Sequence, residues 1–236
     1  MYYFNFLRDI NHEWVFVTNK RVAFSCVLIM SLFLNGCVDL AVNDHKNKHV
    51  DVKKISRVKG EVYTMRGGLG GIFSKGMNRL EDTLENEYHV YASSTVWFKG
   101  RSLSQDIIKN YKAHQEHAPI ILVGHSLGAN EQIQVASALD RAHIPVALLV
   151  TVDAVMPALI PPNVAAACNI YKSSFVPMFS GLVLKARDPK RTQVDNVNVE
   201  SLKGADVNHF TIDGNEQVQH VMLTRVLRAL HKEALR

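Results

Sequence analysis

The chain lacks an apolar run of the roughly 20 residues that a membrane-spanning helix needs. The apolar stretch nearest its N-terminus, Val22 to Leu34, has about 13 residues and follows Lys20-Arg21. A short apolar core behind basic residues is typical of a secretory signal. We therefore predict a signal segment over residues 1–36, with an uncleaved anchor as the alternative.

A strong excess of one charge is also missing. The formal net charge is only +5 at pH 7, and the basic residues are spread along the chain without aromatic residues between them. This pattern indicates an ordinary solvated surface and argues against a nucleic-acid partner. A length of 236 residues with 47% hydrophobic residues is typical of one globular α/β domain, which we place at 57–236.

Phosphate-binding and metal-binding patterns are absent as well. The glycine-rich run Arg66 to Gly71 contains neither G-x-G-x-x-G nor G-K-[ST], so a nucleotide site is not expected. His114 and His117 stand three residues apart, but no third ligand is evident near them. We expect no metal and no organic cofactor.

One motif does carry chemistry: residues 124–128 read Gly-His-Ser-Leu-Gly and fit G-x-S-x-G. The apolar run Pro119 to Val123 before the motif predicts a buried strand, and Ala129 to Arg141 after it predicts a helix. Strand, tight turn and helix are the context of a nucleophile elbow, in which Ser126 would be the nucleophile. His125 cannot easily turn back to the Ser126 hydroxyl, so we expect it to pack beside the turn.

The rest of the domain alternates between strand and helix patterns, which predicts a parallel sheet. A final strand is expected before His209. The remaining predicted strands are 57–65, 88–92, 145–152 and 165–171, and the remaining predicted helices begin at Ser74, at Ser102 or Ser104, and at Asn215.

A serine nucleophile needs a base, and the base needs an acid that fixes its tautomer. His209 lies in a loop between the predicted last strand and last helix, which makes it the best base, with His220 in reserve. Asp153 ends an apolar strand and should stand at the carboxyl edge of the sheet, where ligands bind in open α/β folds. Three further carboxylates remain as alternatives for the acid: Asp188, Asp195 and Asp206.

With these residues the chain resembles the α/β-hydrolase superfamily, and within it small lipase-, esterase- and thioesterase-like proteins. The resemblance implies a mainly parallel sheet with helices on both faces and no large cap domain. It also implies an oxyanion hole formed by the backbone N–H of Leu127 and by the glycine turn, where Gly67, Gly68 or Leu69 is the second donor. Most relatives place the acid one strand later than Asp153, so Asp188 remains an alternative for the acid.

The sequence Leu34-Asn35-Gly36-Cys37 resembles the lipobox of bacterial lipoproteins, in which the cysteine is lipidated. Residues 37–56 would then be a polar tether. Because Cys26 would leave with the signal and Cys37 would carry lipid, Cys168 would be alone, so no intrachain disulfide is expected. The resemblance implies a protein anchored to a membrane of the bacterial envelope, with the periplasmic side of the outer membrane favoured.

The sequence therefore predicts a serine hydrolase that cleaves carboxylic esters or lipids through an acyl-enzyme. An acyl thioesterase or acyltransferase on the same scaffold is the first alternative. A non-catalytic binding or assembly lipoprotein is the second. The sequence leaves acyl length, the alcohol portion and the oligomeric state open.

Overall fold

The computed structural model describes residues 59–175, 179 and 181–234. The predicted signal segment, Cys37 and the tether lie outside these residues. Within the described part of the chain, no helix is both long and apolar enough to cross a membrane.

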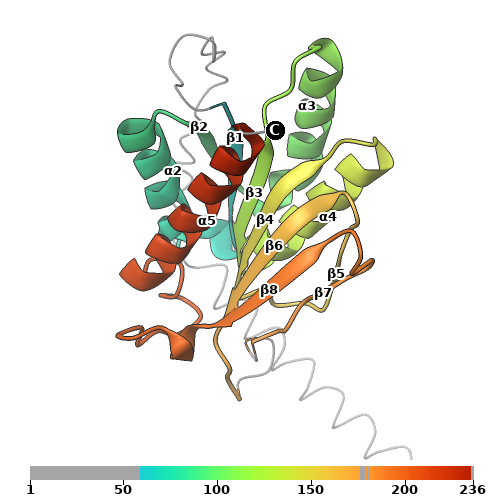
Figure 1. The fold of residues 1–236 in the computed structure, drawn as a ribbon. Coiled ribbons are helices and arrows are strands. Elements are labelled where there is room, and N and C mark those ends of the chain that lie inside the picture. Colours follow the sequence, from blue (N-terminus) through green and yellow to red (C-terminus); the bar gives the residue numbers. More distant parts are fainter. Residues whose placement is uncertain (1–58, 176–178, 180, 235–236) are drawn as a thin grey trace, which may run out of the picture. The chain divides into compact units, whose positions relative to one another are not determined.

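Six strands form one parallel sheet in the order β2-β1-β3-β4-β6-β8 (Figure 1). The central strand β3 is buried at every residue, as its apolar sequence predicts. The strands are β1 (Glu61–Arg66), β2 (Tyr91–Val96), β3 (Ile120–His125), β4 (Val146–Val152), β6 (Val164–Tyr171) and β8 (Gln193–Asn198). A second, two-stranded sheet pairs β5 (Leu159–Ile160) with β7 (Lys185–Ala186).

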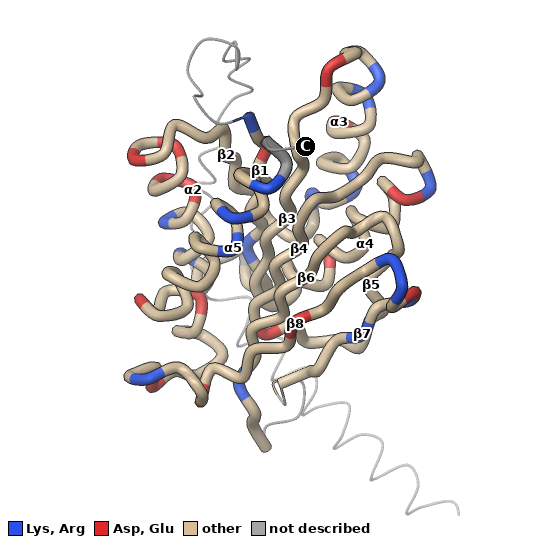
Figure 2. The backbone as a smooth tube through the Cα atoms, viewed as in Figure 1, with Lys and Arg blue, Asp and Glu red and all other residues tan. Residues whose placement is uncertain are grey.

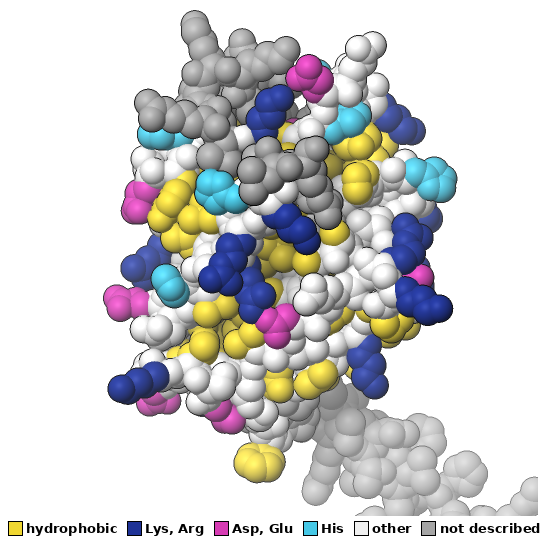
Figure 3. Space-filling model, in the orientation of Figure 1, with side chains coloured by type: hydrophobic (Ala, Val, Ile, Leu, Met, Phe, Trp, Pro, Cys, Tyr) yellow, Lys and Arg dark blue, Asp and Glu magenta, His cyan; other side chains and the backbone are white. Residues whose placement is uncertain are grey.

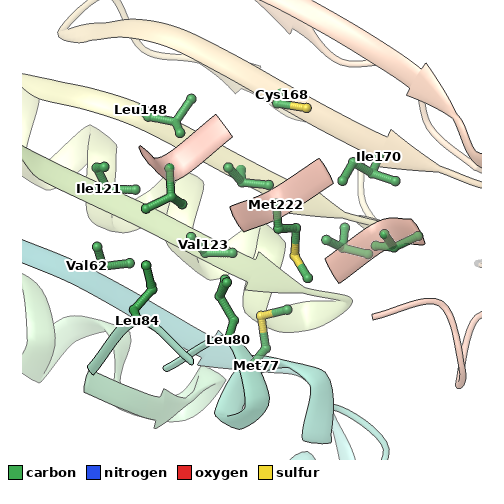
Figure 4. Packing of buried hydrophobic residues seen from close by; sticks show 14 of the residues in the cluster. Val62, Met77, Leu80, Leu84, Ile121, Val123, Leu148, Cys168, Ile170 and Met222 are labelled. Carbon is green, nitrogen blue, oxygen red and sulfur yellow. The ribbon is translucent and has the colours of Figure 1, made fainter. Parts of the chain in front are cut away.

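Helices cover both faces of the large sheet, because alternate residues of a strand point to opposite faces. Ile121 and Val123 of β3 pack with α2 (Lys75–Tyr88) and α5 (Glu216–Ala234) in one apolar cluster, part of which Figure 4 shows. Ile120 and Leu122 pack into the opposite cluster with α3 (Gly100–Ala113) and α4 (Leu127–Arg141). The described residues also contain three short 3₁₀ helices: η2 (Leu69–Gly71), η3 (Trp97–Lys99) and η4 (Val199–Ser201).

Of the two edge strands, β8 is the strand expected before His209, whereas β2 differs from its predicted bounds. The strand expected at 88–92 is β2 at Tyr91–Val96, because α2 continues to Tyr88 and ends where His89 adopts a left-handed conformation with φ 53°. Both β2 and β8 are largely half-exposed and polar, since a strand at the rim of a sheet has only one neighbouring strand. Their sequences therefore lack the apolar run that identified the central strands.

The segment between β4 and β6, where a cap domain was considered from the sequence, is too short to form one. Residues 153–163 connect these strands and contain only the two residues of β5, with no helix.

Residues of both charge signs are distributed over helices and loops, interspersed with hydrophobic side chains (Figures 2 and 3). Because all six strands are parallel, the loops that follow them meet at one edge, which we call the carboxyl edge.

Candidate active site

Ser126 stands on the turn between β3 and α4, at the carboxyl edge. Its backbone has φ 58° and ψ −127°, a conformation that costs energy for a residue with a side chain. Its N–H donates to the Val152 carbonyl at 2.9 Å, which fixes the turn to β4. A Cβ at Gly124 would lie 2.4 Å from the Gly128 oxygen, and one at Gly128 would lie 2.4 Å from the Met65 oxygen. The motif glycines are therefore needed because backbones approach closely on both sides of the serine.

The structure brings Ser126, His209 and Asp153 together in one hydrogen-bonded row. His209 Nε2 lies 2.9 Å from Ser126 Oγ, and His209 Nδ1 lies 2.7 Å from Asp153 Oδ2. A carboxylate only accepts hydrogen bonds, so Nδ1 carries a proton and Nε2 is free to accept the serine proton. All three side chains are buried, with Ser126 and His209 each 8% exposed.

Asp153 follows β4 directly, and the end of β6 fixes its position. Its N–H donates to the Ile170 carbonyl at 2.8 Å, and its Oδ1 accepts the Lys172 N–H at 3.3 Å. A buried carboxylate needs such partners, because an unpaired charge in the interior is costly. These contacts direct the other carboxylate oxygen, Oδ2, to His209.

The alternative acids and bases lie elsewhere. Asp188 accepts the Lys190 N–H in an exposed turn, Asp195 pairs with Arg225 of α5, and Asp206 is exposed. The reserve base His220 is exposed on α5. Of the acids and bases considered from the sequence, only Asp153 and His209 form the row with Ser126.

The glycine turn after β1 lies directly against Ser126. A Cβ at Gly67 would be 2.7 Å from the Ser126 Cβ. The Gly67 N–H already donates to Ser74 Oγ at 2.9 Å, so Gly68 and Leu69 remain as the candidate oxyanion donors of this turn. Leu127 opens α4, and the first N–H groups of a helix have no partner within it. The N-terminus of α4 also carries partial positive charge, which favours an anion there.

Sequence analysis missed Asn130, which holds the loop after Asp153. This buried residue of α4 accepts the N–H groups of Val155 and Met156 at 2.9 and 3.1 Å. It also donates to the Met156 carbonyl at 2.7 Å. An amide on the inward face of a predicted helix, one turn after Ser126, was the available signal.

Two phenylalanine side chains contact the His209 ring. The Phe179 ring stacks on the His209 ring at a centroid distance of 4.1 Å, and Phe210 meets the same ring edge-on at 5.3 Å. Phe73, from the turn after β1, contacts Phe210 at 5.1 Å. The His209 ring therefore lies in an apolar setting that limits access of water from this side.

Large exposed hydrophobic side chains concentrate on the loops of the carboxyl edge. We call this group the apolar rim: Leu69, Phe73, Trp97, Phe98, Met156, Phe175 and Phe210. Its members follow β1, β2, β4, β6 and β8, the strands on both sides of β3, which itself leads to Ser126. Apolar surface gathered around a polar row is typical of a site for a largely apolar ligand.

Other predicted features have structural roles. Cys168 is a free, buried cysteine of the core, and burial raises the pKa of its thiol to about 11. His117 stacks on Tyr111, and His114 Nδ1 lies 2.8 Å from the Asn110 carbonyl. Among residues 59–175, 179 and 181–234, no group of three or more His, Cys, Asp or Glu side chains is placed to hold a metal ion.

No family model matches the chain, and no curated protein matches it in sequence. Solved structures with a related arrangement include the lin2722 gene product of Listeria innocua, 12% identical, with a TM-score of 0.48 over 70% of this chain and 92% of that one. The thioesterase RedJ of the prodiginine pathway of Streptomyces coelicolor is 10% identical, with a TM-score of 0.44 over 72% of this chain and 90% of that one. An acetyl xylan esterase is 13% identical, with a TM-score of 0.41 over 74% of this chain and 100% of that one.

The fold itself follows from the chain's own topology. The sheet is parallel, a serine stands on the sharp turn from its central strand into a helix, and the order along the chain is serine, aspartate, histidine. The described part of the chain has an α/β-hydrolase fold.

Proposed function

We propose that this protein is a serine hydrolase that cleaves carboxylic esters with apolar acyl groups, including lipid esters. The observation that carries the proposal is the row from Ser126 Oγ through His209 to Asp153, with distances of 2.9 and 2.7 Å. A hydroxyl within hydrogen-bonding reach of an imidazole that is itself oriented by a carboxylate is the arrangement of an activated nucleophile.

The first half of the reaction transfers the acyl group to the enzyme. Ser126 Oγ attacks the acyl carbon while its proton passes to His209 Nε2, and the carbonyl oxygen becomes an anion. The N–H of Leu127 and that of Gly68 or Leu69 stabilise this anion. Asp153 stabilises the imidazolium, which then gives its proton to the departing alcohol.

Water completes the cycle. His209 takes a proton from the water molecule as the oxygen attacks the acyl-enzyme. The imidazolium then returns this proton to Ser126 Oγ as the Ser126–acyl bond breaks, which releases a carboxylic acid and restores the serine hydroxyl. No cofactor takes part in these steps.

The apolar rim supports ester substrates with apolar acyl groups. Its side chains lie on loops of the carboxyl edge, the edge at which Ser126 stands, and we propose that the acyl chain of a bound substrate extends over part of this surface. Burial of apolar surface contributes about 25 cal/mol per Å² to binding. Longer acyl chains should therefore bind more tightly than acetyl groups.

The test uses the purified full-length protein with p-nitrophenyl esters of increasing acyl length and with a fluorophosphonate that labels activated serines. We expect hydrolysis, labelling at Ser126 located by mass spectrometry, and loss of both in Ser126→Ala. Folded wild-type protein that neither hydrolyses the esters nor reacts with the probe would favour the non-catalytic alternative. Rapid turnover of acyl thioesters with slow turnover of matched esters would favour the thioesterase alternative.

We also propose that Cys37 is lipidated and anchors the protein to a bacterial envelope membrane. The support is the lipobox-like sequence at Leu34 to Cys37 behind the apolar stretch. Metabolic labelling of expressing cells with an alkyne fatty acid should mark the wild-type protein and not Cys37→Ser. Equal labelling of Cys37→Ser and wild type would overturn this proposal.

A further inference from the structure

A second polar group lies beside the Ser126 row and takes no part in the proposed chemistry. Its centre is His125, the last residue of β3, which is only 1% exposed. The ring of His125 lies 5.2 Å from the ring of His209, yet its hydrogen bonds go to other groups. Nε2 lies 2.9 Å from the backbone oxygen of His209, and Nδ1 lies 2.8 Å from Ser74 Oγ.

These partners fix the protons of His125. A carbonyl oxygen accepts hydrogen bonds and never donates, so Nε2 must carry a proton. In the neutral imidazole Nδ1 is then an acceptor, and the Ser74 hydroxyl donates to it. The contacts thus specify one tautomer, the neutral ring with its proton on Nε2.

Ser74 extends the chain of hydrogen bonds to the glycine turn. Its hydroxyl proton points at His125, which leaves the oxygen to accept the Gly67 N–H at 2.9 Å. Three hydrogen bonds therefore form a row in which each group donates to the next, from Gly67 through Ser74 and His125 to the backbone oxygen of His209. Bonds in such a row polarise and strengthen one another.

Asp213 lies beside this group, but it does not make His125 cationic. Its Oδ1 lies 3.7 Å from His125 Nδ1, while its Oδ2 accepts the Gly76 N–H at 2.8 Å. Burial, together with the neighbouring His209, lowers the pKa of His125 to about 4, although the hydrogen bond to the His209 backbone and the charge of Asp153 oppose that shift. Burial also raises the pKa of Asp213 to about 6, although backbone N–H groups oppose that shift. His125 is therefore neutral at pH 7, as the hydrogen bonds require.

A neutral His125 also suits the reaction. His209 becomes an imidazolium when it takes the serine proton, and a second cation beside it in a buried site would repel it. A neutral ring avoids this repulsion and still donates to the backbone of the base.

We propose that His125 is a positioning residue, which ties the oxyanion turn at Gly67 to the loop of His209 so that both face Ser126 in the reactive geometry. This role rests on the proposed hydrolase function. Displacement of reacting groups by about 1 Å can cost on the order of 100-fold in rate, so the contacts of one buried ring can control the rate without touching the substrate.

Three variants remove different hydrogen bonds of the row that runs from Gly67 to the His209 backbone. His125→Phe keeps a buried ring and removes both bonds. His125→Gln restores an N–H that can reach the His209 carbonyl, and Ser74→Ala removes the link to Gly67. Asn163→Ala is the matched control, because Asn163 also makes two side-chain hydrogen bonds, both to backbone carbonyls, but does so before β6, at the opposite edge of the sheet.

The measurements are kcat and KM for a soluble ester, the rate of fluorophosphonate labelling, and thermal unfolding of each full-length variant. In His125→Phe we expect kcat and the labelling rate to fall on the order of 100-fold with KM nearly unchanged. His125→Gln should recover part of the loss, and Asn163→Ala should keep the wild-type rates. Wild-type rates in His125→Phe would overturn the proposal. So would a loss in Asn163→Ala equal to that in His125→Phe at equal stability.

A second measurement does not depend on activity. Nitrogen-15 NMR of the full-length wild type at pH 7 should show His125 neutral, with its proton on Nε2. A proton on Nδ1, or an imidazolium, would overturn the proposal. Wild-type protein that is unreactive toward the fluorophosphonate would contradict the hydrolase function, while the NMR result would still decide whether His125 joins the two segments.

Discussion

Asp153 and His209 lie 56 positions apart in the chain, yet Asp153 Oδ2 is 2.7 Å from His209 Nδ1. The contact exists because β4 delivers the aspartate and the loop after β8 delivers the histidine to the same edge of a parallel sheet. Both side chains are buried, so the hydrogen bond is shielded from competing water.

Replacement of Asp153 by asparagine should impair catalysis far more than binding. An amide can donate to Nδ1, which would favour the tautomer with the proton on Nε2 and block acceptance of the serine proton. We expect kcat to fall by about 10⁴-fold, as for the same substitution in a serine protease triad, with KM little changed. The measurement is steady-state hydrolysis of a p-nitrophenyl ester.

Asp188→Asn is the control for that experiment. Asp188 lies in an exposed turn and accepts the Lys190 N–H, so its substitution should leave kcat close to the wild-type value. The reverse result, with Asp188→Asn inactive and Asp153→Asn active, would assign the acid to Asp188.

Gly128→Ala should destabilise the protein. The added Cβ would lie 2.4 Å from the Met65 oxygen and 2.8 Å from the Arg66 oxygen, so α4 would have to move away from β1. Such overpacking costs about 1–3 kcal/mol, which urea unfolding can measure. Gly214→Ala is the control, because the nearest atom to its Cβ would be the Thr211 oxygen at 3.8 Å. Equal midpoints for the two variants would contradict this account of the elbow.

The central part of the fold could be predicted because the residues that identify it are adjacent in sequence. The apolar run before Ser126 and the helix pattern after it define the elbow, and Asp153 and His209 stood out by their places after strands. Edge strand β2 was predicted at the wrong position, because its half-exposed and polar sequence lacks the apolar run that identified the central strands. The bonds of His125 to Ser74, 51 positions away, and to His209, 84 positions away, arise only in the folded chain. Sequence analysis therefore predicted that His125 packs beside the turn but not what it holds.

Glu81 should make stability depend on pH. It is 4% exposed on α2, and burial raises its pKa to about 7 from an ordinary value of 4.5. A carboxyl whose pKa is raised by folding favours the protonated form in the native state. Its charge therefore weakens the fold progressively as the pH rises from about 4.5 to about 7. Glu81→Gln should remove this loss.

Urea unfolding at pH 5 and pH 8 tests this expectation. At pH 8 Glu81→Gln should raise the free energy of unfolding by roughly 1–3 kcal/mol, with a smaller difference at pH 5. Glu87→Gln, an exposed carboxylate of the same helix, is the control and should change little at either pH. A Glu81→Gln effect that is the same at pH 5 and pH 8 would show that the side chain does not titrate in this range.

Phe73 and Phe210 should set the preference for acyl length. They contact each other at 5.1 Å beside the His209 ring and are 46% and 44% exposed, so both present apolar surface at the mouth of the site. Truncation of either to alanine removes surface that a long acyl chain covers and an acetyl group does not reach. We expect kcat/KM for a p-nitrophenyl ester of a long fatty acid to fall about 10-fold, since the loss of roughly 1.4 kcal/mol corresponds to 50–60 Å² of buried apolar surface. Hydrolysis of the acetate should stay near the wild-type rate.

Leu159→Ala is the matched control, because Leu159 is 51% exposed on β5 and is not part of the apolar rim. Equal losses on both esters in Phe73→Ala and Phe210→Ala would mean that these rings support His209 and do not select the substrate.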